Sequence, residues 1–329
     1  MWLLDPLTLK LHFFVSPDVV EEGYVILSHV WDEREDTFQD LLAIHARCAA
    51  EGKHPRDLVS EKIKRCCEVA ARNGYKWVWI DTCCIDKTSS TELSEAINSM
   101  YRYYALSLVC YAYLRDVPTD RALASNEANQ FSRSNFSMSK WHRRGWTLQE
   151  LIAPHTVLFL SSTWDYIGSR AGLASEIEEI TEIPTSILRL EQDPSEISVA
   201  QRMSWASHRS TTRLEDEAYC LLGLFGVNMP TLYGEGRKAF RRLQEEIIKQ
   251  TDDTTLYARG QTVTLSYILS SYDALQGQER IFPLFATSPR DFMSSGNVRY
   301  APSIDSKWYT PDPKMKDSSK VSRVELFLS

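Results

Sequence analysis

The first half of the chain alternates short apolar runs with longer amphipathic segments. The apolar runs are each ended by polar residues, and they predict buried strands over residues 24–29, 77–81, 108–114 and 157–160. The remaining segments predict helices over residues 38–50, 58–73, from Ser89 onward and 146–152. Strands that alternate with helices are typical of parallel βαβ units with helices on both sheet faces, which we predict over about residues 22–161.

The helix predicted over residues 58–73 has the clearest pattern. Its apolar face carries, at helical spacing, Val59, Ile63, Cys66, Cys67 and Ala70. Gly74 follows at the position where a left-handed residue closes a helix. The next helix begins with Ser89 and Glu92, which have the S/T-x-x-E spacing of a capping box.

The second half of the chain shows helix after helix. Helical periodicity covers residues 173–183, 215–225 and 237–249, and two short apolar runs at 263–269 and 282–285 suggest strands. We therefore predict three parts: an α/β domain over 1–161, a helical region packed on it over 162–250, and a C-terminal segment over 251–329 that is weakly structured or contains β-strands. The polar stretch 120–139 inside the first part predicts a disordered insert rather than a lid.

Composition excludes several function classes. Among 329 residues, 37 are Lys or Arg and 44 are Asp or Glu, so the net charge of −7 argues against a broad nucleic-acid surface. No apolar run approaches the roughly 20 residues that a membrane span needs. The 7 cysteines form no C-x-x-C pair, which argues against a zinc site or a disulfide framework and predicts reduced thiols in a cytoplasmic protein. The adjacent Cys83 and Cys84 are either redox-active or simply packed.

Polar side chains follow the first two predicted strands. In an open α/β sheet, ligands bind at the carboxyl ends of the strands. The first strand ends in Ser28 and His29 with Trp31 beyond, and the second ends in Asp81 with Asp86 beyond. These groups would suit a planar ligand with hydroxyls. The alternative is that Ser28 and Asp81 cap the following turns and that His29 is a hydrogen-bonded structural residue.

The densest group of functional side chains lies at residues 139–151. Trp146 and Glu150 are spaced i, i+4 and so share one helix face. Burial against the indole would raise the pKa of the Glu150 carboxyl, whereas Arg143 or Arg144 nearby would lower it. The alternative is a tryptophan in the core and a surface salt bridge at Glu150.

Residues 234–239 match the pattern G-x-G-x-x-A of dinucleotide-binding turns. The preceding residues, 229–233, include Pro230 and do not form a buried strand pattern. The match is therefore interpreted as a loop that leads into the helix predicted at 237–249.

Three segments of the chain resemble the signature blocks of the fungal heterokaryon-incompatibility (HET) domain, in the right order: residues 24–31, 78–86 and 144–151. Residues 199–206, 215–219 and 232–236 are similar to the region that commonly follows this domain, so the resemblance covers about residues 1–257. One departure is that Trp31 is followed by Asp32, where the family usually has glycine. A tight glycine turn is therefore not expected at this strand end.

This resemblance implies a role in fungal self/non-self recognition, in which activated HET domains trigger programmed cell death, a form of fungal innate immunity. It also implies a Toll/interleukin-1 receptor (TIR)-like, flavodoxin-like fold: a parallel sheet flanked by helices. Enzymatic TIR domains cleave NAD at the nicotinamide–ribose bond and carry their catalytic glutamate in a Trp-x-x-x-Glu pattern. Residues 146–150 match that pattern, so the resemblance assigns catalysis to Glu150.

The same resemblance sets the expected ligands. NAD is the expected substrate, with no separate cofactor and no metal. The substrate-binding residues expected around Glu150 are Ser28, His29, Trp31, Asp81, Asp86, Arg143, Arg144 and Trp146. Arg143 or Arg144 would meet the pyrophosphate. Clustering by self-association or by an activating sensor protein is expected to switch the domain on, whether the chain is a fragment or a stand-alone member. Two alternatives stay open: a non-catalytic cell-death adaptor that acts by self-association, and a nucleotide-sensing module that does not turn over.

Overall fold

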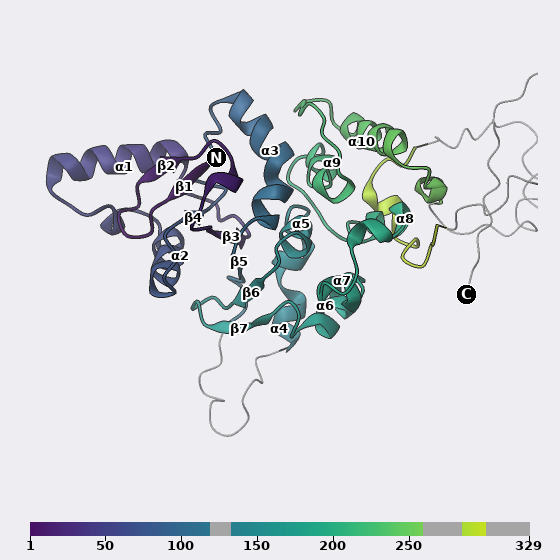
Figure 1. Ribbon diagram of the computed structural model, residues 1–329, viewed down its shortest axis with the longest axis horizontal. Helices are drawn as coiled ribbons and strands as arrows, with labels where there is room; N and C mark the ends of the chain where they lie inside the picture. Colours follow the sequence, from purple (N-terminus) through teal and green to yellow (C-terminus); the bar gives the residue numbers. More distant parts are fainter. Residues whose placement is uncertain (119–132, 259–284, 301–329) are drawn as a thin grey trace, which may run out of the picture.

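A computed structural model describes residues 1–118, 133–258 and 285–300 of the chain (Figure 1). The expected strands at 263–269 and 282–285 lie outside these residues, apart from Phe285, as does most of the polar stretch 120–139. Its last part, however, forms helix α4 (Arg133–Met138), in which Phe136 is buried with its ring 5.2 Å from that of Phe159. That end of the expected insert is therefore folded onto the core.

Within the described ranges, seven strands form one mixed sheet with the order β2-β1-β4-β3-β5-β6-β7. The four central strands are parallel and correspond to the four predicted apolar runs: β3 (Val25–His29), β4 (Val78–Trp79), β5 (Val109–Tyr113) and β6 (Val157–Leu160). The prediction of an α/β fold with a parallel sheet is thus confirmed. Antiparallel strands that were not predicted extend both edges: β1 (Trp2–Leu4), β2 (Leu11–Phe13) and β7 (Tyr166–Ser169).

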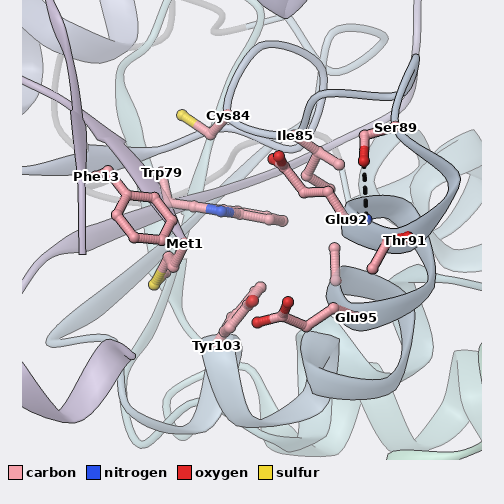
Figure 2. Close-up of a pocket in the computed structure, with 11 residues that line it drawn as sticks. Met1, Phe13, Trp79, Cys84, Ile85, Ser89, Thr91, Glu92, Glu95 and Tyr103 are labelled. Atoms are coloured by element: carbon pink, nitrogen blue, oxygen red, sulfur yellow. Dashed lines mark hydrogen bonds between the residues drawn. The ribbon is translucent and has the colours of Figure 1, made fainter. Parts of the chain in front are cut away.

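Three long helices connect the first strands, at the expected places. They are α1 (Phe38–Glu51), α2 (Glu61–Arg72) and α3 (Ser90–Ala105). Gly74 is left-handed, with φ of 82°, just after the end of α2. Ser89 caps α3 by accepting a hydrogen bond from the Glu92 backbone N–H, drawn as a dashed line in Figure 2. The Glu92 side chain instead accepts from the backbone of Asp86, so only half of the expected capping box forms.

The described residues beyond β7 are mainly helical. Their helices are α6 (Ala174–Thr181), α7 (Thr185–Leu188), α8 (Val199–Ser204), α9 (Asp216–Tyr219) and α10 (Lys238–Gln250). The single helix expected over 215–225 is instead α9 followed by a 3-10 turn at Gly223–Phe225. None of the helices in the described ranges is both long and apolar enough to span a membrane.

The helical region and the sheet domain share one hydrophobic core. Helices α3 and α5 (Thr147–Ile152) lie between the sheet and helices α8–α10 (Figure 1). The backbone of Gly223 comes so close to α3 that a Cβ there would lie 2.0 Å from the Cβ of Tyr101. The helical region therefore packs directly on the elements that carry the expected site.

Candidate functional site

A cavity of about 360 Å³ opens at the carboxyl ends of β3 and β4, where sequence analysis expects a ligand. Its polar wall carries three carboxyl groups and three cations, namely Asp81, Glu150, Asp216, Lys87, Arg144 and Arg213. Its apolar wall comes mostly from α3 and the turn after β4, with Ile85, Leu93, Ile97, Met100 and Tyr104. Aromatic rings of Trp31, Trp146 and Tyr233 also line it, together with His29, Thr147 and Thr212. A mixed apolar and polar lining of this kind is typical of small-molecule sites.

Figure 2 shows a second, smaller cavity, of about 190 Å³, on a neighbouring face of α3. Trp79, Tyr103, Glu92 and Glu95 are among the residues that line it. None of the expected site residues lines this second cavity. We therefore place the candidate site in the larger cavity.

Glu150 lies on α5, with only 8% of its surface exposed, in the wall of the larger cavity. The Ser28 hydroxyl donates a hydrogen bond to Glu150 Oε2, and the Trp141 indole N–H donates to Ser28 Oγ over 2.7 Å. Burial raises the pKa of the Glu150 carboxyl to about 8, and the negative charge of Asp81 adds to the effect, although hydrogen bonds from Ser28 and Tyr104 oppose it. The alternative of a surface salt bridge at Glu150 is therefore wrong.

His29 and Asp81 are joined in a chain of hydrogen bonds that begins at Lys62 of α2. The Lys62 ammonium lies 3.0 Å from His29 Nδ1, so that nitrogen accepts and the proton of a neutral ring sits on Nε2. His29 Nε2 then donates to Asp81 Oδ1 over 3.0 Å, and Trp31 Nε1 donates to Asp81 Oδ2 over 2.8 Å. Although burial works in the opposite direction, these two bonds and the charge of Lys87 hold the pKa of the Asp81 carboxyl below its usual value. The chain fixes the Trp31 ring at the cavity.

Lys62 was not among the expected site residues. Its ammonium also forms ion pairs with Glu35 at 2.5 Å and with Asp32 at 2.9 Å, and the residue is only 8% exposed. The sequence does contain a signal for it: Lys62 is three residues after Val59 and four before Cys66, on the apolar face of its helix. A lysine at such a position is buried, and a buried ammonium requires partners.

The remaining expected residues divide into two groups. Trp146 and Arg144 line the cavity, and Arg144 Nη1 also donates to Thr212 Oγ1 over 3.2 Å. Asp86 and Arg143 lie outside the cavity lining. The Asp86 carboxylate accepts from the backbone N–H of Thr88 in the turn before α3, and the Arg143 side chain is exposed. Ser28 acts from behind Glu150 rather than from the cavity surface.

The helical region supplies part of the cavity that sequence analysis does not foresee. Thr212, Arg213, Asp216 and Tyr233 line it from residues beyond 161. The strand-like segment at Ser210 pairs with the residues before α5: Gly145 N–H donates to Ser210 O over 2.9 Å, and Ser210 N–H donates to Arg143 O over 2.7 Å. The cavity is therefore built jointly by the α/β domain and the helical region.

This junction depends on the absence of a side chain at Gly145. A Cβ there would lie 2.4 Å from Cγ2 of Thr211 and 3.2 Å from the sulfur of Cys220. We expect Gly145→Ala to lower the free energy of unfolding by about 2 kcal/mol, because the new methyl group must displace the Thr211 side chain from its packed position. Urea unfolding measures this loss. The double variant Gly145→Ala/Thr211→Ser, which removes the obstructing methyl, should recover most of it; equal losses in both variants would contradict the explanation.

No cluster of three or more His, Cys, Asp or Glu that could hold a metal ion occurs in the described parts of the chain. The seven cysteines are buried free thiols, and burial raises the pKa of the Cys83 thiol well above its usual value. That result favours packing over redox activity for the Cys83–Cys84 pair. The functional groups that line the cavity are its carboxyl groups, its cations and its aromatic rings.

Comparison with known proteins gives one strong relative. Residues 24–136 match the family model "Heterokaryon incompatibility protein (HET)", and residues 238–310 match a domain of unknown function, DUF8212. The chain is 46% identical over 229 residues to the vegetative incompatibility protein HET-E-1 of Podospora anserina. These residues are 69% of this chain. The match spans only 16% of that relative's length. No solved structure matches the chain.

Proposed function

The chain belongs to the fungal HET domain proteins, and we propose that it triggers cell death in heterokaryon incompatibility by cleaving NAD at the nicotinamide–ribose bond. The observation that carries this proposal is the position of Glu150: a buried carboxyl, held by Ser28, in the wall of a cavity at the strand ends. Cell death would then follow from the loss of NAD in the cytoplasm.

The chemistry of NAD cleavage suits a single carboxylate. When the C–N bond breaks, its electron pair leaves with the nicotinamide nitrogen, which was positively charged and becomes neutral. The ribose develops positive charge, as in glycoside cleavage. Water then adds to the sugar carbon and releases a proton, which gives ADP-ribose and nicotinamide. A fixed carboxylate in a cavity with little water stabilises the developing charge.

The high pKa of Glu150 is compatible with this role. The carboxyl has a pKa of about 8, because it is buried. A positively charged nicotinamide ring beside it would favour the ionised form and lower that pKa. The substrate would thus generate the carboxylate that its own cleavage needs.

The rest of the cavity supports a dinucleotide ligand. Leu93, Ile97 and Met100 offer an apolar surface to a planar ring, and Arg144 offers a guanidinium to a pyrophosphate. The parallel order β4-β3-β5-β6 is the 2-1-3-4 order of flavodoxin-like sheets, which supports the TIR-like kinship. Within that order, Glu150 follows the third parallel strand.

The test is a direct count of products. The purified chain, dilute and then clustered through a fused oligomerisation tag, is incubated with NAD, and nicotinamide is measured by mass spectrometry. We expect release that rises steeply on clustering, since self-association or a sensor protein is the proposed activator. Toxic expression in cells whose NAD stays constant would contradict cleavage and favour the adaptor that acts by self-association alone.

A further inference from the structure

Two segments of the helical region are bonded to each other beside the cavity. The Glu215 carboxylate accepts hydrogen bonds from the backbone N–H groups of Gly234 and Gly236, over 2.7 and 2.9 Å. Both glycines have positive φ, 103° and 61°, a conformation that other residues rarely adopt. The Gly-x-Gly loop therefore wraps an internal carboxylate, which explains why its match to a dinucleotide turn is misleading.

Tyrosine side chains extend this connection. The Tyr219 hydroxyl accepts from the backbone N–H of Leu232 over 2.6 Å and donates to Glu235 Oε1 over 3.0 Å. The rings of Tyr219 and Tyr233 pack edge to face, with centroids 5.5 Å apart. These contacts fix the loop and set the direction of Tyr233.

The connection ends at a carboxyl group in the cavity wall. The Tyr233 hydroxyl donates to Asp216 Oδ1 over 2.9 Å, and both residues line the cavity that contains Glu150. Asp216 is 9% exposed, and burial raises the pKa of its carboxyl, although hydrogen bonds from Tyr233 and Trp146 and the charge of Arg213 oppose the rise. The groups that hydrogen-bond it, Tyr233 and Trp146, are neutral donors, and Asp216 makes no ion pair with any residue that the structure describes, although the charge of Arg213 acts on it from a greater distance. Its negative charge therefore lacks a contacting cation.

We propose that Asp216, positioned by Tyr233, is a specificity residue that binds the positively charged ring of a pyridinium nucleotide. The inference rests on the proposed function for its ligand class and adds a residue from outside the α/β domain. A cationic ring beside Asp216 would give this carboxyl the contacting cation that it lacks. The phosphates of the same ligand would meet Arg144 and Arg213, so a ligand with both charges matches the cavity as a whole.

A comparison of the affinities for the oxidised and the reduced nucleotide separates recognition of the ring's charge from recognition of the ligand's shape. NADH has nearly the shape of NAD, but its nicotinamide ring is neutral. The full chain with Glu150→Gln, which we expect to consume NAD about a thousandfold more slowly than the wild type, is titrated with each nucleotide by calorimetry. We expect NAD to bind roughly tenfold more tightly than NADH. Adding Asp216→Asn should reduce that ratio to about one by weakening NAD binding alone.

Two further variants complete the design. Tyr233→Phe keeps the Asp216 carboxyl but removes the hydrogen bond that positions it, so the affinity ratio should fall partly, to roughly threefold. This variant also tests the inference if Asp216→Asn does not fold. Glu245→Gln, an acid on α10 whose carboxylate pairs with Arg241 at the surface, should leave the ratio unchanged. An affinity ratio that stays unchanged in both Asp216→Asn and Tyr233→Phe would overturn the assignment. An equal loss of affinity for both nucleotides would overturn it as well.

The outcomes distinguish this inference from the proposed function. If the wild-type chain releases no nicotinamide but the binding ratio depends on Asp216, cleavage is wrong and the specificity residue stands. If the chain cleaves NAD but the ratio of NAD to NADH affinity does not depend on Asp216, only the assignment of Asp216 as a specificity residue is wrong. Failure of both nucleotides to bind at millimolar concentration would overturn both.

Discussion

Glu150→Gln is expected to lower the rate of nicotinamide release from NAD about a thousandfold, because it removes the charge that stabilises the ribose cation. Loss of one pre-organised electrostatic group commonly costs 10²–10³ in rate, or about 3–4 kcal/mol. Glutamine keeps the shape of the side chain and can still accept the hydrogen bond from Ser28, so the loss should reflect charge rather than packing. The turnover rate of the clustered chain with saturating NAD measures it.

A matched comparison separates this effect from a general disturbance of the site. Ser28→Ala leaves Glu150 in place but removes a hydrogen bond that favours its ionised form, so the pKa of the carboxyl should rise further above about 8. The rise of kcat/KM with pH should then move to higher pH, while the maximal rate at high pH changes little. Retention of full activity by Glu150→Gln would refute the catalytic assignment, whatever Ser28→Ala does.

The central part of the fold could be predicted because buried parallel strands have a simple pattern. Four apolar runs between amphipathic helices identified β3, β4, β5 and β6, although β4 is shorter than expected. The edge strands gave no such pattern. β2 carries His12 between Leu11 and Phe13 and is partly exposed, and β7 has no buried residue, so neither shows an uninterrupted apolar run.

The site could be predicted as far as it depends on strand ends. Ser28 and His29 are the last residues of β3, Trp31 follows it, and Asp81 follows β4, so the sheet brings them to one edge. Asp86 and Arg143 were included among the binding residues because their sequence neighbours were. They do not line the cavity, because the direction of a side chain, which sequence position does not give, decides whether it reaches a cavity.

The contribution of the helical region could not be predicted from the sequence. Asp216 is 66 residues beyond Glu150, and only the folding of the helical region onto the α/β domain brings both to one cavity. Local periodicity contains no information on such a long-range contact. Segments 215–219 and 232–236 were recognised in the sequence because they resemble the region that follows the HET domain. Their structural role became clear only from the hydrogen bonds that Glu215 accepts from Gly234 and Gly236.

Glu150→Gln is also expected to make the protein more stable at alkaline pH. The pKa of this carboxyl is about 8 in the folded protein against 4.5 for the free group, so the folded state holds the proton more tightly than the unfolded state does. Its contribution to stability is therefore fully present below about pH 4.5 and is lost as the pH rises through about 8. Since each tenfold difference in proton affinity is worth about 1.4 kcal/mol, ionisation of Glu150 costs the folded state roughly 5 kcal/mol at pH 9.

Glutamine does not ionise, so the variant escapes this cost. Urea unfolding at pH 5 and pH 9 should give similar free energies for wild type and variant at the lower pH, and a variant that is more stable by several kcal/mol at the higher pH. Other groups titrate equally in both proteins and cancel in the difference, and the exposed Glu245→Gln should show no such divergence. An advantage that is the same at both pH values would mean that Glu150 ionises in the folded protein without penalty. The expected divergence, together with the loss of activity, would mean that the chain keeps a carboxyl that destabilises its fold because the reaction requires it.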